Sequence, residues 1–178
     1  YIVSNNKLDN KLKMLAEYKE IPEDNIMSYN EDTLMDLYDE LEADFIQEKA
    51  DKKFNHRLII MDDVGYSGSL KNKQSGVISK LISNGRHLGL SQIYTTQRFT
   101  MASAILKSNV TAACFGNTSM AELDLIAESF NYLKSKKDFV NLFRKYTAEP
   151  RSFLCVNFTN PDGIYQDSEF KTINTKGL

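Results

Sequence analysis

Residues 57–65 have the sequence Arg-Leu-Ile-Ile-Met-Asp-Asp-Val-Gly, in which an unbroken apolar run leads directly into two adjacent carboxylates, Asp62 and Asp63. A continuous apolar run of this kind is typical of a strand buried on both faces, as in a parallel sheet covered by helices. Ligands bind at the carboxyl ends of such strands in α/β proteins. The two aspartates are therefore predicted to lie at the rim of a binding site, unless the strand simply runs into a solvated acidic turn.

Strand-like and helix-like segments alternate along the rest of the chain. Further strands are predicted at residues 1–5, 90–96, 110–115 and 152–158. Helix N-caps are indicated at Asn30, Ser119 and Ser135, and a helix C-cap at Gly85. This order predicts an α/β fold with a mainly parallel sheet flanked by helices, in one domain over residues 1–159 with a C-terminal extension at 160–178 that forms a loop or a short edge element.

Composition limits the classes of protein that need to be considered. The 178 residues are 42% hydrophobic and 26% charged, as in a globular domain. No apolar run approaches the roughly 20 residues that cross a bilayer, and the N-terminus lacks the pattern of a signal peptide, so we expect an intracellular protein with no membrane requirement. The net charge of −2 argues against general coating of nucleic acid, although the chain is acidic before residue 56 and basic after it.

The cysteines do not indicate a metal site. Cys114 and Cys155 each lie in a predicted strand, there is no CxxC motif, and the only histidines are His56 and His87. A structural zinc site needs four such ligands at suitable spacing. Both cysteines are therefore predicted to be reduced core residues.

Three sets of polar residues follow predicted strands or helices. They are Asp62 with Asp63, Arg86 with His87, and residues 95–97 with the sequence Thr-Thr-Gln. Because parallel strands present their carboxyl ends at one edge of a sheet, the first and third sets are predicted to lie side by side. Paired acids beside an amide and a cation are the groups that phosphoryl transfer from a nucleotide requires.

These segments resemble a known family. Residues 58–65 (Leu-Ile-Ile-Met-Asp-Asp-Val-Gly), 81–93 (Leu-Ile-Ser-Asn-Gly-Arg-His-Leu-Gly-Leu-Ser-Gln-Ile) and 94–97 (Tyr-Thr-Thr-Gln) are similar in order and spacing to the genome-packaging ATPases of poxviruses and related large DNA viruses, in the FtsK/HerA superfamily. The resemblance implies a P-loop NTPase core of the RecA/ASCE type that uses ATP and Mg²⁺ to move double-stranded DNA into a capsid. It also implies a homo-oligomeric ring, a pentamer or hexamer, with capsid vertex or portal proteins as candidate partners, in the cytoplasm of the infected cell or in the virion.

The resemblance assigns roles by position. Asp62 matches the Walker B aspartate that supports Mg²⁺ through water, and Asp63 matches the adjacent acid that orients the hydrolytic water. Gln97 matches the residue that senses the γ-phosphate, so these three side chains would form the nucleotide site. Arg86 matches an arginine finger that acts in trans on the neighbouring subunit. From the residues alone, Arg86 could instead be a favourable cation at a helix C-terminus and Gln97 a surface amide at a strand end.

The sequence lacks one part that this family requires. No GxxxxGK[ST] loop, which binds phosphates through backbone N–H groups and a lysine, occurs in the 178 residues. Since the chain begins at Tyr1 and in a predicted strand, we expect the N-terminal phosphate-loop strand and helix to lie upstream. The alternative is a degenerate relative that does not hydrolyse ATP and has a structural role.

Other classes remain open at this point. A cellular or plasmid translocase of the same superfamily would use the same residues, and a receiver-type signalling domain also has a strand that ends in paired acids. A structural capsid or scaffold protein is the non-enzymatic possibility. Lys71 and Lys73 could contact DNA phosphates, but the interpretation as ordinary exposed lysines is favoured. A solvated surface is also slightly favoured over a DNA track for the basic cluster Lys134, Lys136, Lys137, Arg144, Lys145 and Arg151.

Overall fold

A computed structural model describes residues 1–6, 9–64 and 76–176. Lys71 and Lys73, for which a DNA contact was considered above, lie outside the described residues. The chain forms two compact units, Tyr1–Asn109 and Val110–Leu178. None of the helices in the described ranges has the length and apolar character needed to cross a bilayer.

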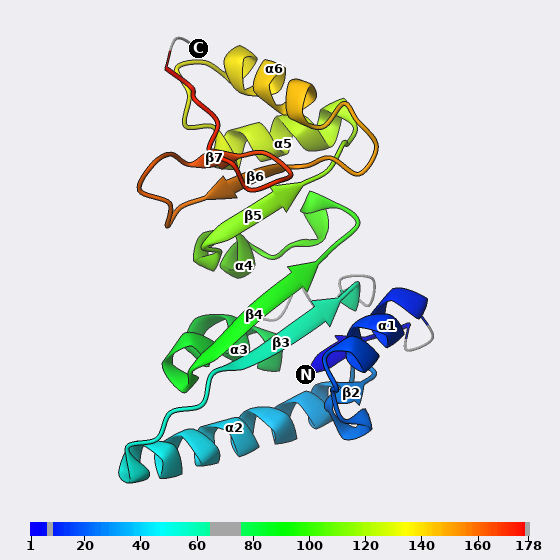
Figure 1. Cartoon of the computed structure of the whole chain (residues 1–178), viewed down its shortest axis with the longest axis vertical. Coiled ribbons are helices and arrows are strands. Elements are labelled where there is room, and N and C mark those ends of the chain that lie inside the picture. The colour runs from blue at the N-terminus through cyan, green and yellow to red at the C-terminus, as the bar shows by residue number, and fades with distance from the viewer. Residues whose placement is uncertain (7–8, 65–75, 177–178) are drawn as a thin grey trace. The chain divides into compact units, whose positions relative to one another are not determined.

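The first unit contains a four-stranded parallel sheet with strand order β2-β1-β3-β4 (Figure 1). Its strands are β1 (Ile2–Ser4), β2 (Ile26–Met27), β3 (Arg57–Asp62) and β4 (Leu90–Thr95), and its helical segments are α1 (Asn10–Tyr18), η1 (Glu23–Asn25), α2 (Glu31–Asp51), α3 (Val77–Asn84), η3 (Gly85–Leu88), η4 (Phe99–Met101) and α4 (Ala104–Asn109). The quoted stretch is thus a parallel strand that ends at Asp62, as predicted, but it is not buried on both faces, because Ile59 and Met61 are fully buried whereas Leu58 is 41% exposed. In this four-stranded sheet β4 is one of the two edge strands, and Ile93 in its middle is 48% exposed.

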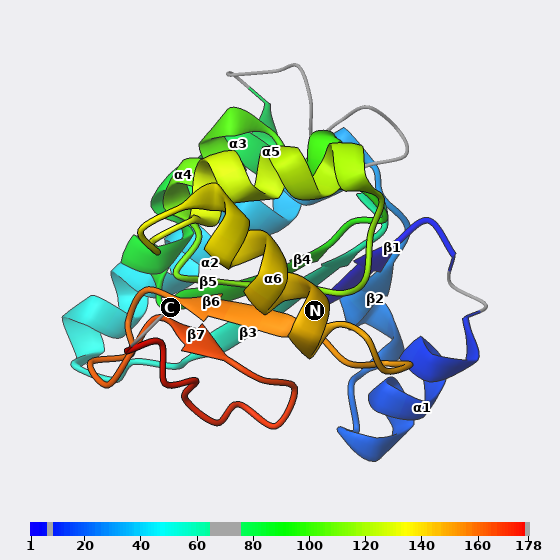
Figure 2. The same cartoon turned by 90° about the horizontal axis from the view of Figure 1, so that it is seen from above.

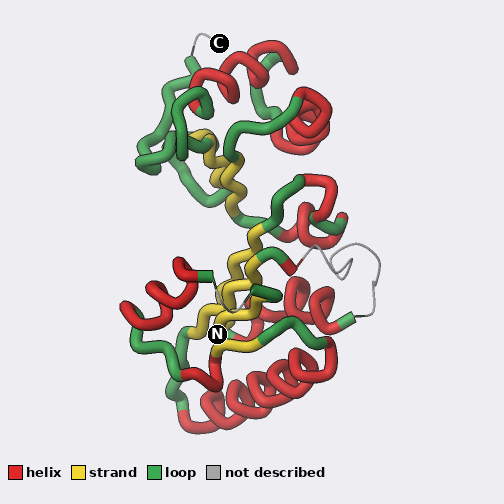
Figure 3. The backbone as a smooth tube through the Cα atoms, turned by 90° about the vertical axis from the view of Figure 1, so that its right-hand side faces the viewer, coloured by secondary structure: helices red, strands yellow, loops and turns green. Residues whose placement is uncertain are grey.

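Helices α2 and α3 build the core against one face of this sheet. Leu34 and Leu41 of α2 and Leu81 of α3 are fully buried and pack in one cluster with Ile59 and Met61 of β3. Helix α1 lies on the other side of the strands from α3 (Figures 2 and 3).

Helix α2 begins as the sequence predicted. The side chain of Asn30 accepts hydrogen bonds from the backbone N–H groups of Asp32 and Thr33, which occupies two of the free donors at the helix start. The same is true of the other predicted caps, because Ser119 and Ser135 each accept a backbone N–H from the residue three positions later. Local sequence therefore fixes three helix starts.

Arg57 fixes the beginning of β3 to α2. Its guanidinium donates hydrogen bonds to the carboxylate of Glu48 and lies 3.2 Å from Asp44 Oδ2. The hydrogen bond from Arg57 lowers the pKa of Glu48 to about 2, and two hydrogen bonds from Asn55 act in the same direction. The longest helix of this unit and its central strand are thereby held in a fixed relation.

The second unit contains a three-stranded antiparallel sheet, β5-β6-β7, with β5 (Ala112–Phe115), β6 (Leu154–Asn157) and β7 (Tyr165–Gln166). Its helices are α5 (Met120–Phe130) and α6 (Lys136–Tyr146), and Phe130 and Phe139 from them pack against aromatic side chains of the sheet. The Tyr165 hydroxyl donates to the Phe130 carbonyl over 2.9 Å and accepts the Tyr132 N–H over 2.7 Å.

Two local expectations need correction. Gly85 is the C-cap of α3, as predicted, but its backbone is right-handed (φ −54°) and the chain continues as η3, so the left-handed position that ends the helical region is Gly89 (φ 67°). Cys155 is buried, whereas Cys114 is exposed and does not belong to the core. It lies on β5, at the edge of its sheet, where fewer neighbours cover it.

Candidate nucleotide site at the end of the parallel sheet

Three strand ends meet at the same level of the parallel sheet. The pairing register aligns Ser4 of β1 with Asp62 of β3, and Asp62 with Thr95 of β4. A carboxylate on the central strand therefore has a hydroxyl on each neighbouring strand. This arrangement follows from the parallel register, because all three residues end their strands.

Both hydroxyl groups hold the Asp62 carboxylate. Thr95 Oγ1 donates to Asp62 Oδ1 over 2.7 Å, and Ser4 Oγ donates to Oδ2 over 3.3 Å. Ser4 is almost completely buried and in turn accepts the N–H of Asn6. Each oxygen of Asp62 thus has one hydroxyl donor and retains acceptor capacity for a further ligand.

Asp63 turns the chain away from the sheet. Its φ of 51° is in the left-handed region, which aspartate adopts more readily than most residues. Its backbone N–H donates to Thr95 Oγ1 over 3.1 Å, and its side-chain Oδ2 accepts the Gln97 amide over 2.9 Å. Thr95 therefore connects the side chain of Asp62 to the backbone of Asp63.

One oxygen of this pair has no partner in the described parts of the chain. Asp63 Oδ1 is buried and accepts no hydrogen bond from any described residue. An unpaired buried carboxylate oxygen is costly, so a water molecule or another donor is expected beside it. The predicted closeness of the acids and the strand end at 95–97 is confirmed by the bond between Gln97 and Asp63.

Arg86 is not part of this cluster within one chain. It lies in η3, immediately before β4, and is exposed together with His87. The acids lie at the other end of the strand, and the six residues of β4 span roughly 20 Å at about 3.3 Å per residue. The side chain cannot cover that distance to the aspartates of its own chain.

Gly85 is required here because of close packing. A Cβ at this position would lie 2.2 Å from Gln92 Nε2, which donates to the Leu81 carbonyl over 2.7 Å. The Gln92 amide oxygen accepts a hydrogen bond from the Tyr94 hydroxyl. Burial raises the pKa of Tyr94. The segment that presents Arg86 is thus held against β4 by a partly buried amide.

The residues at the strand ends fit Mg²⁺ only in one of its binding modes. No group of three or more His, Cys, Asp or Glu side chains within the described ranges could hold a metal ion. Mg²⁺ is commonly bound by one or two carboxylates together with water and nucleotide phosphates. Two aspartates and two hydroxyls, with acceptor capacity left on both carboxylates, agree with that mode and not with a metal cage made by protein alone.

Sequence reasoning gave no role to Ser4 and Thr95. Ser4 lies in a short strand with no motif around it, and Thr95 was included only as part of the segment 95–97. The signal that could have identified them is positional, since hydroxyl residues end the strands on both sides of an acidic strand end. The number of residues between these strands does not reveal their register.

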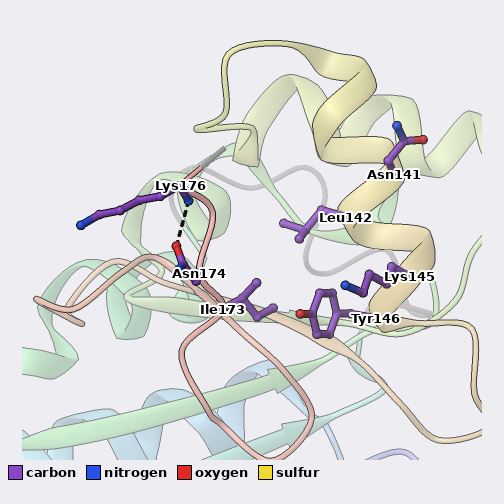
Figure 4. Close-up of a pocket in the computed structure, with 7 residues that line it drawn as sticks. All are labelled: Asn141, Leu142, Lys145, Tyr146, Ile173, Asn174 and Lys176. Atoms are coloured by element: carbon purple, nitrogen blue, oxygen red, sulfur yellow. Dashed lines mark hydrogen bonds between the residues drawn. The ribbon is translucent and has the colours of Figure 1, made fainter. Parts of the chain in front are cut away.

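A separate pocket of about 290 Å³ lies in the second unit (Figure 4). It is lined by α6 and the C-terminal segment, through Asn141, Leu142, Lys145, Tyr146, Ile173, Asn174 and Lys176. These lining residues include no carboxylate, so the pocket lacks the acids that nucleotide hydrolysis needs. Of the predicted basic cluster, Lys136 is paired with Asp124 over 2.8 Å, as expected of a solvated helix surface.

Comparison with known proteins identifies viral relatives. The family model described as Poxvirus A32 protein matches residues 17–170. The DNA packaging protein OPG160 of Vaccinia virus (strain Copenhagen) is 29% identical over 120 residues, which are 67% of this chain and 40% of the relative. The protein of the same name from Monkeypox virus is 29% identical over 120 residues, with 67% and 36% covered. The chain thus spans less than half the length of these relatives.

Solved structures show the same fold. The genome packaging NTPase B204 from Sulfolobus turreted icosahedral virus 2 in complex with AMPPCP has a TM-score of 0.61 and 19% identity, over 98% of this chain and 82% of that chain. The complex of the same NTPase with ATP-gammaS gives a TM-score of 0.60 at 19% identity, with 98% and 83% covered. Together with the parallel sheet flanked by helices, this likeness confirms the predicted fold class.

Proposed function

The chain belongs to the Poxvirus A32 protein family, and from this premise we propose that it is most of the motor domain of an ATPase that moves double-stranded DNA into a viral capsid. The observation that carries the proposal is the hydrogen-bonded set Asp62, Asp63, Thr95 and Gln97 at one sheet edge. Family membership favours this task over that of a cellular or plasmid translocase. The set also gives the paired acids a role that a purely structural protein would not need.

The two aspartates have different surroundings and therefore different proposed roles. Each oxygen of the Asp62 carboxylate accepts a hydrogen bond from a hydroxyl group. This carboxylate would hold Mg²⁺ through water molecules. Asp63 keeps a buried oxygen without a partner among the described residues, which is a suitable acceptor for the attacking water. Bound Mg²⁺ would neutralise charge on the phosphates, while these side chains orient the water and the ion.

Gln97 is the proposed sensor of the γ-phosphate. Its amide Nε2 donates to Asp63 Oδ2, so its position is tied to the acid that would orient the water. It is exposed and follows the end of β4. A movement of Gln97 in response to the γ-phosphate would therefore be transmitted to β4. The amide thus provides a physical connection between the nucleotide and the rest of the motor.

Arg86 is the proposed arginine finger, and it would act in trans. It is exposed at the end of β4 that is remote from the acids. A homo-oligomeric ring, with DNA gripped at its phosphates in the centre, would bring this arginine to the site of the adjacent subunit. Because such contacts with DNA phosphates would be local, they are compatible with the net charge of −2 on the whole chain.

The phosphate-binding loop would come from outside these 178 residues. They contain no GxxxxGK[ST] motif, and the relatives are more than twice as long as the matched segment. ATP binding is therefore proposed for the longer protein. The packaging machine would act in the cytoplasm of the infected cell or in the virion.

The substitution Asp63→Asn in the full-length protein tests the proposal. We expect DNA-stimulated phosphate release to fall about 10²- to 10⁴-fold because the water loses its acceptor. Binding of a fluorescent ATP analogue should change little, because the Asp62 contacts remain. Asp36→Asn, at an exposed position of α2, is the matched control and should hydrolyse ATP normally.

Two results would contradict the proposal. Undiminished phosphate release by Asp63→Asn would remove the role of this acid. A full-length natural protein that binds neither ATP nor its analogue would instead indicate a degenerate relative with a structural role.

A further inference from the structure

Strands β5 and β6 of the second unit lie side by side (Figure 1), and their antiparallel register places Cys114 directly opposite Cys155. Both are free thiols. Cys114 is exposed, whereas Cys155 is 2% exposed on the central strand of its sheet. The nucleotide site described above uses neither residue.

The hydrogen-bonding pattern shows which type of cross-strand pair they form. The Phe158 N–H donates to the Thr111 carbonyl over 3.0 Å, so Thr111 and Phe158 are a hydrogen-bonded pair. The Asn157 N–H donates instead to Ile164, on the other side of β6. Since hydrogen-bonded and non-hydrogen-bonded pairs alternate, Cys114 and Cys155 occupy a non-hydrogen-bonded pair.

This position suits a disulfide bond. In a non-hydrogen-bonded pair the Cα atoms are about 4.5 Å apart and the two side chains are on the same face. Disulfides join cysteines whose Cα atoms are separated by about 4.4–6.8 Å. A bond between the two sulfur atoms could therefore form without displacement of the strands.

The thiols already interact. The adjacent Cys155 thiol lowers the pKa of Cys114 to about 7, and the proximity of Cys114 raises the pKa of Cys155. The exposed sulfur is thus the one that becomes a thiolate, and the thiolate is the reactive form. The buried thiol lies beside it, in the position of a resolving cysteine.

We propose that Cys114 and Cys155 are a redox modification site, at which a small-molecule disulfide of the glutathione type converts the two thiols into a cross-strand disulfide. The Cys114 thiolate attacks one sulfur of glutathione disulfide, which forms a mixed disulfide and releases one glutathione thiolate. Cys155 then loses its proton to that thiolate and attacks the Cys114 sulfur, which releases the second glutathione. Two protein thiols are oxidised by two electrons, and one glutathione disulfide is reduced to two glutathione molecules.

The bond would affect a defined part of the chain. It would close a loop from β5 to β6 that contains both α5 and α6. A cross-link that closes such a loop restricts the unfolded state more than the folded state. The oxidised second unit should therefore melt at a higher temperature than the reduced one, and dithiothreitol should reverse the shift.

A glutathione redox titration of the chain tests the proposal. Samples are equilibrated at increasing ratios of oxidised to reduced glutathione, quenched with acid and alkylated, and then examined by intact-mass and peptide mass spectrometry. We expect both cysteines to become protected from alkylation together, with no glutathione attached and with the chain still monomeric on a non-reducing gel. Dithiothreitol should restore both labels.

Single variants separate the two steps. Cys155→Ser should accumulate glutathione on Cys114, because no thiol remains to displace it. Cys114→Ser should leave Cys155 unmodified, because the remaining thiol is buried. Serine is close to cysteine in size, and the circular dichroism spectrum of each variant serves as a check of folding.

Three outcomes would overturn the proposal. In the natural chain, glutathione could remain on Cys114, which would show that Cys155 does not resolve the mixed disulfide. Disulfide-linked dimers could form, which would show that the partner thiol is in another chain. Both thiols could also stay reduced under conditions that modify Cys155→Ser.

Discussion

Thr95 Oγ1 lies 2.7 Å from Asp62 Oδ1 and donates a hydrogen bond to it, so the end of β4 holds the carboxylate at the end of β3. The same oxygen accepts the backbone N–H of Asp63 over 3.1 Å. One hydroxyl thus positions both acids of the candidate site. Neighbouring strands share this contact because their register aligns these two residues.

Thr95→Val should separate this positioning from simple packing. Valine has nearly the shape of threonine but leaves the Asp63 N–H without its acceptor, so we expect a loss of about 0.5–1.5 kcal/mol in urea unfolding and slower ATP hydrolysis by the full-length protein. Thr95→Ser keeps the hydroxyl and should restore most of both. Thr96→Val is the matched control, since that hydroxyl donates to the Arg98 carbonyl rather than to the acids. Equal turnover in Thr95→Val and Thr95→Ser would argue against the positioning role.

Arg86→Ala should inactivate ATP hydrolysis in a way that a second inactive variant can rescue. Subunits with Arg86→Ala keep their own acids, and subunits with Asp63→Asn keep their arginine. Mixed assemblies should therefore contain some complete sites, and phosphate release should recover partly when the two inactive proteins are combined. Lack of any recovery, with assembly confirmed by sedimentation, would contradict a finger that acts in trans.

Gly85→Ala should destabilise the fold through a clash with Gln92. The added methyl group would lie 2.2 Å from Gln92 Nε2 and 3.1 Å from its Cδ, and the amide can move only by giving up its bonds to Leu81 and Tyr94. We expect a loss of about 1–3 kcal/mol in urea unfolding. Gly116→Ala is the control, because a Cβ there would meet nothing within 4 Å. In a double-mutant cycle, Gln92→Ala should reduce the cost of Gly85→Ala, and strict additivity would exclude the clash.

Acid should weaken the fold partly through Glu48. Its pKa is lowered from 4.5 to about 2 by the hydrogen bond from Arg57, so the folded state favours the ionised form. This contribution to the free energy of unfolding is complete above pH 4.5 and is lost as the pH falls towards 2. Urea unfolding between these values should show a shallower pH dependence in Glu48→Gln than in the natural chain. Glu42→Gln, at an exposed position of the same helix, should keep the natural slope.

The sequence predicted the parts of this fold that depend on local patterns. The apolar run before Asp62 is β3, and the caps at Asn30, Ser119 and Ser135 begin α2, α5 and α6. Each of these features is decided by neighbouring residues, through an apolar run in which Ile59 and Met61 are buried or through a side chain that binds its own helix start. The proximity of Gln97 to Asp63 was also predictable, because parallel strands end at the same edge.

Features that depend on register or on tertiary contact were not predictable in the same way. The alignment of Ser4 with Asp62 joins strands that are far apart in sequence, and no local signal fixes it. Gly85 is the predicted cap of α3, but its close approach to Gln92, which follows it by a turn and part of a strand, has no local signal. Cys114 has the composition of a core strand around it, but its place at an edge of the sheet exposes it.

The outer edge of β4 has a consequence for the solubility of this chain. A terminal strand offers a row of unpaired N–H and carbonyl groups, and the exposed Ile93 adds an apolar contact beside them. Such an edge is a template for strand pairing, so concentrated samples of the 178 residues should precipitate or form mixed aggregates unless another strand covers it. A charged residue in the middle of an edge strand discourages this pairing, and Ile93→Lys should keep the chain in solution at concentrations where the natural sequence clouds.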